Sequence, residues 1–204
     1  MSTARVSTAR VRLSPDARRE QLLDLGVRML ATRGVDELSI DLLAEEAGVS
    51  RGLLYHYFGS KHEFHHAVVR RAADDVIRVT APRPEGDPLE RLAGSLEAYV
   101  DYVVANFEGY SSLVRGAASG NPALREIYEE ARAALTDRLF EAAGPGGLAV
   151  LGVEDTPATR LMARGWSAMT EEVVLTWARD HHGLPKQQLL AMLTAALPAV
   201  LSTA

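Results

Sequence analysis

The sequence predicts an all-α protein, with an N-terminal three-helix helix-turn-helix unit and a larger C-terminal helical body. Three observations support this fold class. Apolar residues recur three and four positions apart over most of the chain. Many of these segments begin with Ser, Asn or Pro and are followed by Gly, which is the usual punctuation of helices. We find no convincing alternation of apolar and polar residues and no hairpin dipeptide between apolar runs, so nothing indicates a β-sheet.

The first four predicted helices have clear N-terminal signals. The first begins at Pro15 and ends before Gly34, the second covers "LSIDLLAEEAG", and the third covers "SRGLLYHYF". The fourth begins at "SKHEFHH", where Glu63 completes a capping box, and it ends before the loop "PRPEGDP". The expected N-cap residues are Ser14, Ser39, Ser50 and Ser60.

Longer helices are expected after that loop, over residues 88–106 and 108–118. A further helix starts at Pro122, and the segment "GPGGLAVLGVEDTP" is expected to be a glycine-rich connection. Two final helices are expected over "TPATRLMARGWSAMTEEVVLTWARDHHG" and "LPKQQLLAMLTAALPAVL". The last one carries apolar residues on more than one face, which predicts burial on two sides, in a bundle or at a subunit interface.

Composition excludes several classes of protein. The chain has 204 residues, of which 47% are apolar and 24% charged, as in ordinary globular proteins. It has no Cys, so it can form neither a disulfide nor a thiolate metal site. The N-terminus lacks the apolar core of a signal peptide, and no apolar run approaches the roughly 20 residues that span a bilayer. We therefore expect a soluble cytoplasmic protein that does not enter a membrane.

The charge is unevenly distributed. The net charge of −5 disfavours general binding to nucleic acid. The first 19 residues nevertheless carry five arginines and one acidic residue, Asp16. This basic start is either a solvated tail or an arm that contacts phosphate.

The segment "VSRGLLYHYFGSK" follows a short helix and the turn "AGVS", which is the arrangement of a helix-turn-helix. Gly48 permits the tight turn. In the helix that follows, Leu54 and Phe58 are four residues apart and should pack inward together. At about 100° per residue, Gly52 and Leu53 then point away from that packed face.

The exposed face of this helix suits the major groove of DNA. Gly52 keeps its first turn slim, Arg51 can donate two hydrogen bonds to guanine, and Leu53 can contact a thymine methyl group. We therefore interpret Arg51, Gly52 and Leu53 as the residues that face the bases.

Aromatic hydroxyls and a terminal lysine flank this base-facing set. Tyr55 and Tyr57 can reach phosphate oxygens, and Lys61 lies in the first turn of the next helix, where free backbone N–H groups favour an anion. The alternative is that both tyrosines are core aromatics of a small three-helix unit. Both roles can hold together.

Residues 15–70 resemble the DNA-binding domain of TetR-family transcriptional regulators. The matching stretch is "ATRGVDELSIDLLAEEAGVSRGLLYHYFGSKHEFHHAVV", with the pattern G-V-S-x-G-x-L-Y-x-Y-F-x-S-K-x-x-F, and it covers about a quarter of the chain. The resemblance implies phosphate contacts by Ser39, Tyr55, Tyr57 and Lys61, and we add Ser50, the N-cap of the same helix as the tyrosines, as a further expected phosphate contact. Asp41 stands where some members carry a basic residue that contacts a base, so that contact is not carried over.

The resemblance also implies a function and a domain organisation. The expected function is a ligand-responsive, sequence-specific regulator, a repressor released from a palindromic operator by a small, largely apolar effector. The expected partners are double-stranded DNA with an inverted repeat, the effector and a second copy of the chain, with no cofactor. The expected domains are a basic flexible arm over 1–13, a helix-turn-helix domain over 14–60, a connecting helix over 61–81, and a ligand-binding and dimerisation domain over 82–204.

The C-terminal body offers candidates for an effector pocket and a dimer interface. Aromatic residues and methionines with a few polar tips suit an apolar ligand. The candidate pocket residues are Tyr99, Tyr102, Val103, Phe107, Tyr110, Leu113, Met162, Trp166, Met169 and Val173. The candidate dimer residues on the last two helices are Trp177, Leu189, Leu193, Leu197 and Leu201. The alternative in both cases is that these side chains belong to the core of a single subunit.

Other classes of function have weaker support. His62 and His66 are four residues apart, a spacing that can hold a metal, but no third ligand is evident, and we predict no metal site. The roles of these two histidines and of His65 stay open. "GPGGLAVLG" lacks the Lys-Ser/Thr of a phosphate-binding loop, and no nucleophile-elbow pattern occurs, so we do not expect an enzyme. A protein-interaction module with the same fold is the remaining alternative.

Overall fold

The computed structural model of the chain describes residues 14–150 and 152–202. The predicted basic arm, residues 1–13, lies outside the described residues. Within the described ranges the regular structure is helical and contains no strand, which confirms the predicted all-α class. Among the described helices, none combines the length and the apolar composition needed to cross a bilayer.

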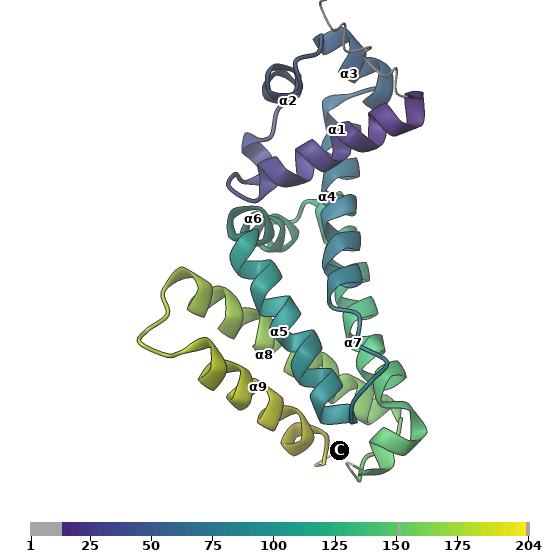
Figure 1. The fold of residues 1–204 in the computed structure, drawn as a ribbon, viewed down its shortest axis with the longest axis vertical. Coiled ribbons are helices and arrows are strands. Elements are labelled where there is room, and N and C mark those ends of the chain that lie inside the picture. Colours follow the sequence, from purple (N-terminus) through teal and green to yellow (C-terminus); the bar gives the residue numbers. More distant parts are fainter. Residues whose placement is uncertain (1–13, 151, 203–204) are drawn as a thin grey trace, which may run out of the picture.

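The N-terminal part is a compact group of short helices at one end of an elongated molecule (Figure 1). Its elements are α1 (Pro15–Leu30), the 3₁₀ turn η1 (Val35–Glu37), α2 (Ile40–Ala47), α3 (Arg51–Phe58) and the longer α4 (Lys61–Val79). The four predicted N-cap serines are confirmed, but the capping box predicted with Glu63 is not formed, because the backbone N–H of Ser60 donates to the carbonyl oxygen of Phe58. Ser14 Oγ, for example, accepts a hydrogen bond from the Ala17 backbone N–H at 3.2 Å, directly before the proline that opens α1. The sequence did not predict η1.

The C-terminal body contains five longer helices in the described ranges. They are α5 (Pro88–Ala105), α6 (Phe107–Ala118), α7 (Pro122–Val150), α8 (Pro157–Arg179) and α9 (Lys186–Leu201). Figure 1 shows α5, α7, α8 and α9 side by side below α6, with α4 running down from the N-terminal group.

The predicted glycine-rich connection is wrong over its first half, because α7 continues as a helix to Val150. Packing explains the difference. Leu148 is buried in the core of the body, and a Cβ on Gly147 would lie 2.8 Å from Pro88 Cγ, so this last part of α7 is held against the start of α5. Tertiary burial here overrides the low helix propensity of glycine.

Two apolar cores hold the molecule together. One joins α1–α4 around Leu38, Leu43 and Phe64, and it extends to Ile127 on α7. The other lies in the body, around residues such as Val100 on α5. Because α4 contributes residues to both cores, it joins the N-terminal group to the body.

The N-terminal group also rests on α6. Gly109 lies so close to α1 that a Cβ there would be 2.5 Å from the carbonyl oxygen of Leu30. A few residues further along α6, the hydroxyl of Ser112 accepts a buried hydrogen bond of 2.9 Å from the backbone N–H of Val35. A shift of α6 would therefore act directly on the end of α1 and the turn that follows it.

Candidate DNA-binding surface and ligand cavity

Helices α2 and α3 form the predicted helix-turn-helix. Gly48 ends α2 with φ 63° and ψ 38°, a left-handed conformation that glycine adopts without strain. The side chain of Ser39 accepts a hydrogen bond of 3.1 Å from the Leu42 N–H, and that of Ser50 accepts one of 3.3 Å from the Leu53 N–H. Both serines therefore cap helices, and their predicted phosphate contacts are not tested.

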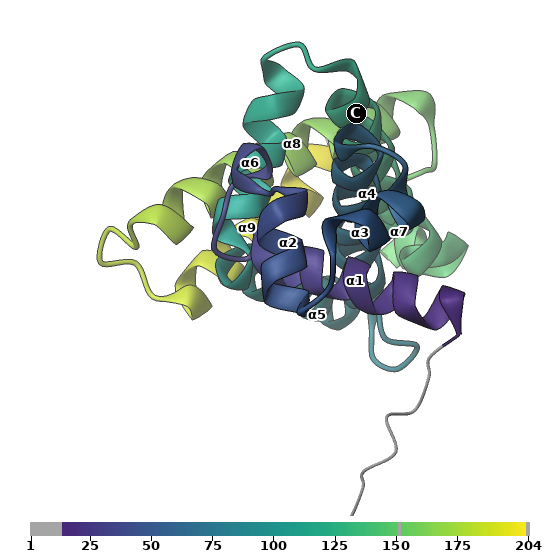
Figure 2. The ribbon, with the colours of Figure 1, turned by 90° about the horizontal axis from the view of Figure 1, so that it is seen from above.

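The first turn of α3 is slim and open. Arg51 and Gly52 are exposed, and Leu53 is half-buried. Arg51 Nε lies 2.6 Å from a carboxylate oxygen of Asp41 on α2. Leu54 packs inward as predicted. Figure 2 shows α2 and α3 on the face nearest the viewer when the molecule is seen from the N-terminal end.

The two tyrosines of α3 differ in their surroundings. Tyr55 is 49% exposed, whereas Tyr57 is half-buried and packs against the N-terminal core. The expectation of a core aromatic therefore holds in part for Tyr57. Lys61 is exposed in the first turn of α4, behind the N-cap Ser60, whose hydroxyl accepts a 3.1 Å hydrogen bond from the backbone N–H of Glu63.

His65 has a structural contact. Its Nε2 donates to the carbonyl oxygen of Leu38, just before α2, and burial lowers the pKa of the imidazole. A neutral imidazole in this position ties α4 to the start of α2. The described residues contain no group of three or more His, Cys, Asp or Glu side chains that could hold a metal ion.

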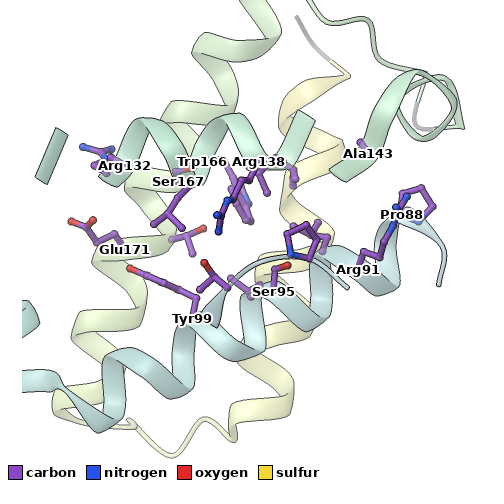
Figure 3. Close-up of a pocket in the computed structure, with 18 of the residues that line it drawn as sticks. Pro88, Arg91, Ser95, Tyr99, Arg132, Arg138, Ala143, Trp166, Ser167 and Glu171 are labelled. Carbon is purple, nitrogen blue, oxygen red and sulfur yellow. The ribbon is translucent and has the colours of Figure 1, made fainter. Parts of the chain in front are cut away.

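The body contains a cavity between α5, α7 and α8 (Figure 3). The free space in and around it is about 990 Å³, a volume that includes the open solvent at its mouth. Its lining is mostly apolar, with a minority of polar and charged side chains. The lining residues are Thr80, Pro82, Pro88, Leu89, Arg91, Leu92, Ser95, Leu96, Tyr99, Tyr110, Arg132, Leu135, Arg138, Leu139, Ala143, Trp166, Ser167, Thr170, Glu171 and Leu197.

A hydrogen-bonded network closes one end of this cavity. Glu171 accepts hydrogen bonds from the hydroxyls of Tyr128, at 2.8 Å, and Tyr110, at 3.4 Å. The hydroxyls of Tyr99 and Tyr110 are 3.0 Å apart, and Arg132 donates to the Tyr128 hydroxyl at 3.2 Å. Burial raises the pKa of the Glu171 carboxyl and of the tyrosine hydroxyls, since charge is unfavourable away from water.

Some predicted pocket residues line cavities. Tyr99, Tyr110 and Trp166 line the cavity described above. Tyr102, Tyr110 and Leu113 line a smaller cavity nearer the N-terminal group, between α1, α4, α6 and α7. Tyr110 thus lies between the two cavities.

Other predicted pocket residues line neither cavity. Val103 is fully buried in the core of the body, and Phe107 is half-buried outside both linings. Met162, Met169 and Val173 are 38%, 41% and 36% exposed on α8 and line neither of the two cavities. They share an apolar stripe with Trp166, but Trp166 is buried whereas these three side chains reach the surface of α8.

Sequence reasoning missed the polar residues of the cavity. They are Thr80, Arg91, Ser95, Arg132, Arg138, Ser167, Thr170 and Glu171. Arg91, Ser95 and Tyr99 follow one another at intervals of four on α5, so helical spacing does place them on one face. No such signal indicates that α7 and α8 bring their own polar residues to the same space.

The predicted dimer residues are part of the subunit core. Trp177, Leu189, Leu193, Leu197 and Leu201 are all buried within the single chain, and Leu197 also lines the cavity. They lie on the faces of α8 and α9 that turn toward the rest of the body, so their packing is satisfied without a partner. The large apolar side chains that stay exposed on these two helices are different ones, namely Leu161, Met162, Met169, Val173 and Met192.

An open helix-turn-helix at one end and a helical body with an apolar cavity define a class of protein, the ligand-binding transcriptional regulators. Comparison of the sequence with family models agrees. Residues 22–68 match the model for bacterial regulatory proteins of the tetR family, and residues 88–199 match a tetracyclin repressor-like C-terminal domain. The second match alone covers more than half of the chain. The chain belongs to the TetR family of DNA-binding transcriptional regulators.

Individual relatives differ in how they act. The chain is 29% identical to the HTH-type transcriptional activator FasR of Mycolicibacterium smegmatis, over 86% of this chain and 78% of that one. It is 36% identical to the HTH-type transcriptional repressor KstR2 of Mycobacterium tuberculosis, over 39% of this chain and 40% of that one. A tetR-family regulator from Streptomyces coelicolor has a solved structure similar to this one, with a TM-score of 0.79, 30% identity, and coverage of 94% of this chain and 83% of that chain.

Proposed function

We propose that this protein is a ligand-responsive regulator that binds an inverted-repeat operator as a homodimer and is released from it by a small, largely apolar effector. The observation that carries the proposal is the combination of two features in one chain. The first turn of α3 is exposed and narrow, and the body contains a mostly apolar cavity. Arg51, Gly52 and Leu53 face the bases, while Ser39, Ser50, Tyr55, Tyr57 and Lys61 contact phosphates. Binding to the chromosome places the protein in the cytoplasm.

The proposed dimer interface is the open flank of α8 and α9. Large apolar side chains are exposed on both helices, namely Leu161, Met162, Met169 and Val173 on α8 and Met192 on α9, and exposed apolar surface of this kind is typical of a protein interface. Small side chains on the same flank, such as Ala195 and Gly165, allow close approach of helices. A two-fold pair of subunits presents two copies of α3, which fits an inverted repeat.

Effector binding acts on the DNA-binding end through α6. Tyr110 lines the cavity, and its neighbours Gly109 and Ser112 hold the end of α1 and the turn after it. A ligand that displaces Tyr110 moves α6 and shifts the protein toward a state with a different spacing of its two α3 helices. The relatives include an activator and a repressor, so the position of the operator relative to the promoter decides whether release raises or lowers transcription.

The first test is selection of bound sequences from a random DNA duplex library by the purified full-length protein. We expect an enriched inverted repeat, whose binding weakens steeply with salt because phosphate contacts release counterions. The Arg51→Ala variant serves as the control for base reading. No enrichment by a folded protein, with or without a small-molecule extract of cells, would contradict the DNA-binding role and leave the protein-interaction alternative. Loss of binding when the extract is added supports release by a ligand.

A further inference from the structure

The cavity between α5, α7 and α8 carries more positive than negative charge. Arg91, Arg132 and Arg138 line it, against one carboxylate, Glu171. Among the described residues, no carboxylate oxygen lies within 4.0 Å of these three guanidinium groups. By contrast, Arg71 on α4 pairs with two carboxylates at 2.6 Å and 2.9 Å. The cavity therefore attracts an anion.

One of the three arginines is free to bind such an anion. Arg132 donates to the hydroxyl of Tyr128, and Arg138 donates to the carbonyl oxygen of Ile77. Arg91 Nε is buried and has no hydrogen-bond partner in the part of the chain that the structure describes. Arg91 is thus a cation that lines an apolar cavity, and no described protein group accepts a hydrogen bond from its Nε–H.

Two further buried polar atoms of the cavity lack a hydrogen-bond partner among the described residues. The buried side-chain atoms that lack a hydrogen-bond partner among the described residues are Arg91 Nε, Ser95 Oγ and Thr170 Oγ1, and all three residues line this cavity. A buried donor without a partner costs stability, so proteins rarely keep several in one place without a function. Because Arg91 and Ser95 are four residues apart on α5, they face the same side of that helix.

The position of these groups fixes the orientation of a ligand. Figure 3 shows Arg91 beside Pro88 at one end of the cavity, Ser95 further along α5, and Glu171 with Tyr99 at the other end. The Glu171 end is already satisfied, since both carboxylate oxygens accept hydrogen bonds from tyrosines. Arg132 at this end also has a partner, the hydroxyl of Tyr128, whereas Arg91 Nε has none among the described residues, so an acidic group finds its unpaired donor at the Arg91 end.

We propose that the effector is an amphiphile with an acidic headgroup, a carboxylate or a phosphate, which binds Arg91 and Ser95, while its apolar chain extends along Leu96, Leu139 and Trp166. A guanidinium can donate two parallel hydrogen bonds to either acid. The two leucines and the tryptophan supply apolar contacts to the chain of the ligand, as most of the other lining residues also can. This inference rests on the proposed function, because it assigns the effector to this cavity.

Titration of the full-length protein with four ligands of equal chain length tests the headgroup. The probes are decanoate, decanoyl-coenzyme A, decanol and decyltrimethylammonium, and their binding is followed by calorimetry and by intrinsic tryptophan fluorescence, to which Trp166 and Trp177 contribute. We expect decanoate or decanoyl-coenzyme A to bind roughly ten to a hundred times more tightly than the neutral and cationic probes, as for a hydrogen bond to a charged group. Which of the two acids binds better distinguishes a free carboxylate from a phosphate-bearing thioester.

Two variants and a control connect the preference to residues. Arg91→Gln should abolish the preference for the acids and leave decanol binding unchanged, whereas Arg179→Gln, on the exposed last turn of α8, should change neither. Ser95→Ala should weaken the acids as well, yet leave the ligand-free protein as stable as before or more stable, because it removes an unsatisfied hydroxyl. A residue with only a structural role would not weaken the binding of the acids while leaving the ligand-free protein as stable as before or more stable.

Several results would overturn the proposal. They are equal affinity for all four probes, tightest binding of decyltrimethylammonium, no binding of any probe at millimolar concentration, or an Arg91→Gln variant that retains the preference. Selection of an operator by the same preparation is measured separately. Enrichment of an inverted repeat together with any of these results leaves the proposed function standing and rejects only the acidic headgroup.

Discussion

The close contact between α6 and α1 can be tested by adding one methyl group. A Cβ on Gly109 would lie 2.5 Å from the carbonyl oxygen of Leu30 and 2.9 Å from its Cβ, whereas ordinary contact begins near 3.4 Å. The overlap of about 0.9 Å is partly with backbone, so no side-chain rotation relieves it. In Gly109→Ala the two helices must separate, and the packing between the N-terminal group and α6 must loosen.

The expected magnitude follows from two opposing effects. Overpacking of this kind costs typically about 1–3 kcal/mol. Replacing glycine by alanine within a helix returns at most about 0.5–1 kcal/mol, and less here because Gly109 lies in the first turn of α6. We therefore expect Gly109→Ala to lower the free energy of unfolding by about 1–2 kcal/mol.

The assay is urea unfolding followed by far-ultraviolet circular dichroism, with Gly94→Ala as the matched control. Gly94 lies in the middle of α5, where an added Cβ would meet no atom within 4 Å. The control should gain about 0.5–1 kcal/mol, since only the helix-propensity effect remains. If Gly109→Ala unfolds at the same urea concentration as the control, with an unchanged slope, then the α6–α1 contact does not limit packing and the reasoning is wrong.

Four further predictions concern the proposed sites. Arg51→Ala should cost roughly 1–3 kcal/mol of operator affinity and relax specificity at one base pair per half-site, measured on a set of single-base operator variants; an equal loss on every sequence would contradict base reading. Lys61→Ala should weaken all sequences alike and reduce the slope of log affinity against log salt by about 1 per half-site, and an unchanged slope would mean that it contacts no phosphate. Met169→Glu should convert the dimer to monomers in sedimentation at micromolar concentration, whereas Val104→Glu, an exposed apolar position on α5, should not. Because burial raises the pKa of Glu171, the folded state retains a proton that the unfolded state has lost, so stability falls as pH rises from the ordinary carboxyl pKa to the raised one. Glu171→Gln should flatten this part of the pH profile of urea midpoints, and an unchanged profile would show that another group causes it.

Local chemistry made the N-terminal half predictable. The caps at Ser14, Ser39 and Ser50 depend on atoms within three residues of each serine, and the structure has these hydrogen bonds. Leu54 and Phe58 pack inward as their spacing requires. In such short helices the sequence determines the start, the end and the exposed face, which is why the helix-turn-helix and the exposed first turn of α3 could be placed without a structure.

The structure of the body was harder to predict, because it depends on contacts between segments that are distant in the sequence. The end of α7 is helical because Gly147 and Leu148 pack against other parts of the body, although glycine there favours a loop. Met169 and Trp166 lie on one apolar stripe of α8, yet one is exposed and the other lines the cavity. Apolar spacing identifies the side of a helix that avoids water, but not the neighbour that covers it.

The sequence by itself thus determined the fold class, the helix-turn-helix and the family. Only the tertiary structure decided which residues form the cavity and which remain open to a partner. Arg91, Arg138 and Glu171 come from three different helices, and they line one cavity only because those helices pack together. Leu189 and Leu193, expected at a subunit interface, are instead enclosed by the chain's own core. The physical reason is that burial is a property of the assembled helices, whereas capping and helical spacing are properties of the chain over a few residues.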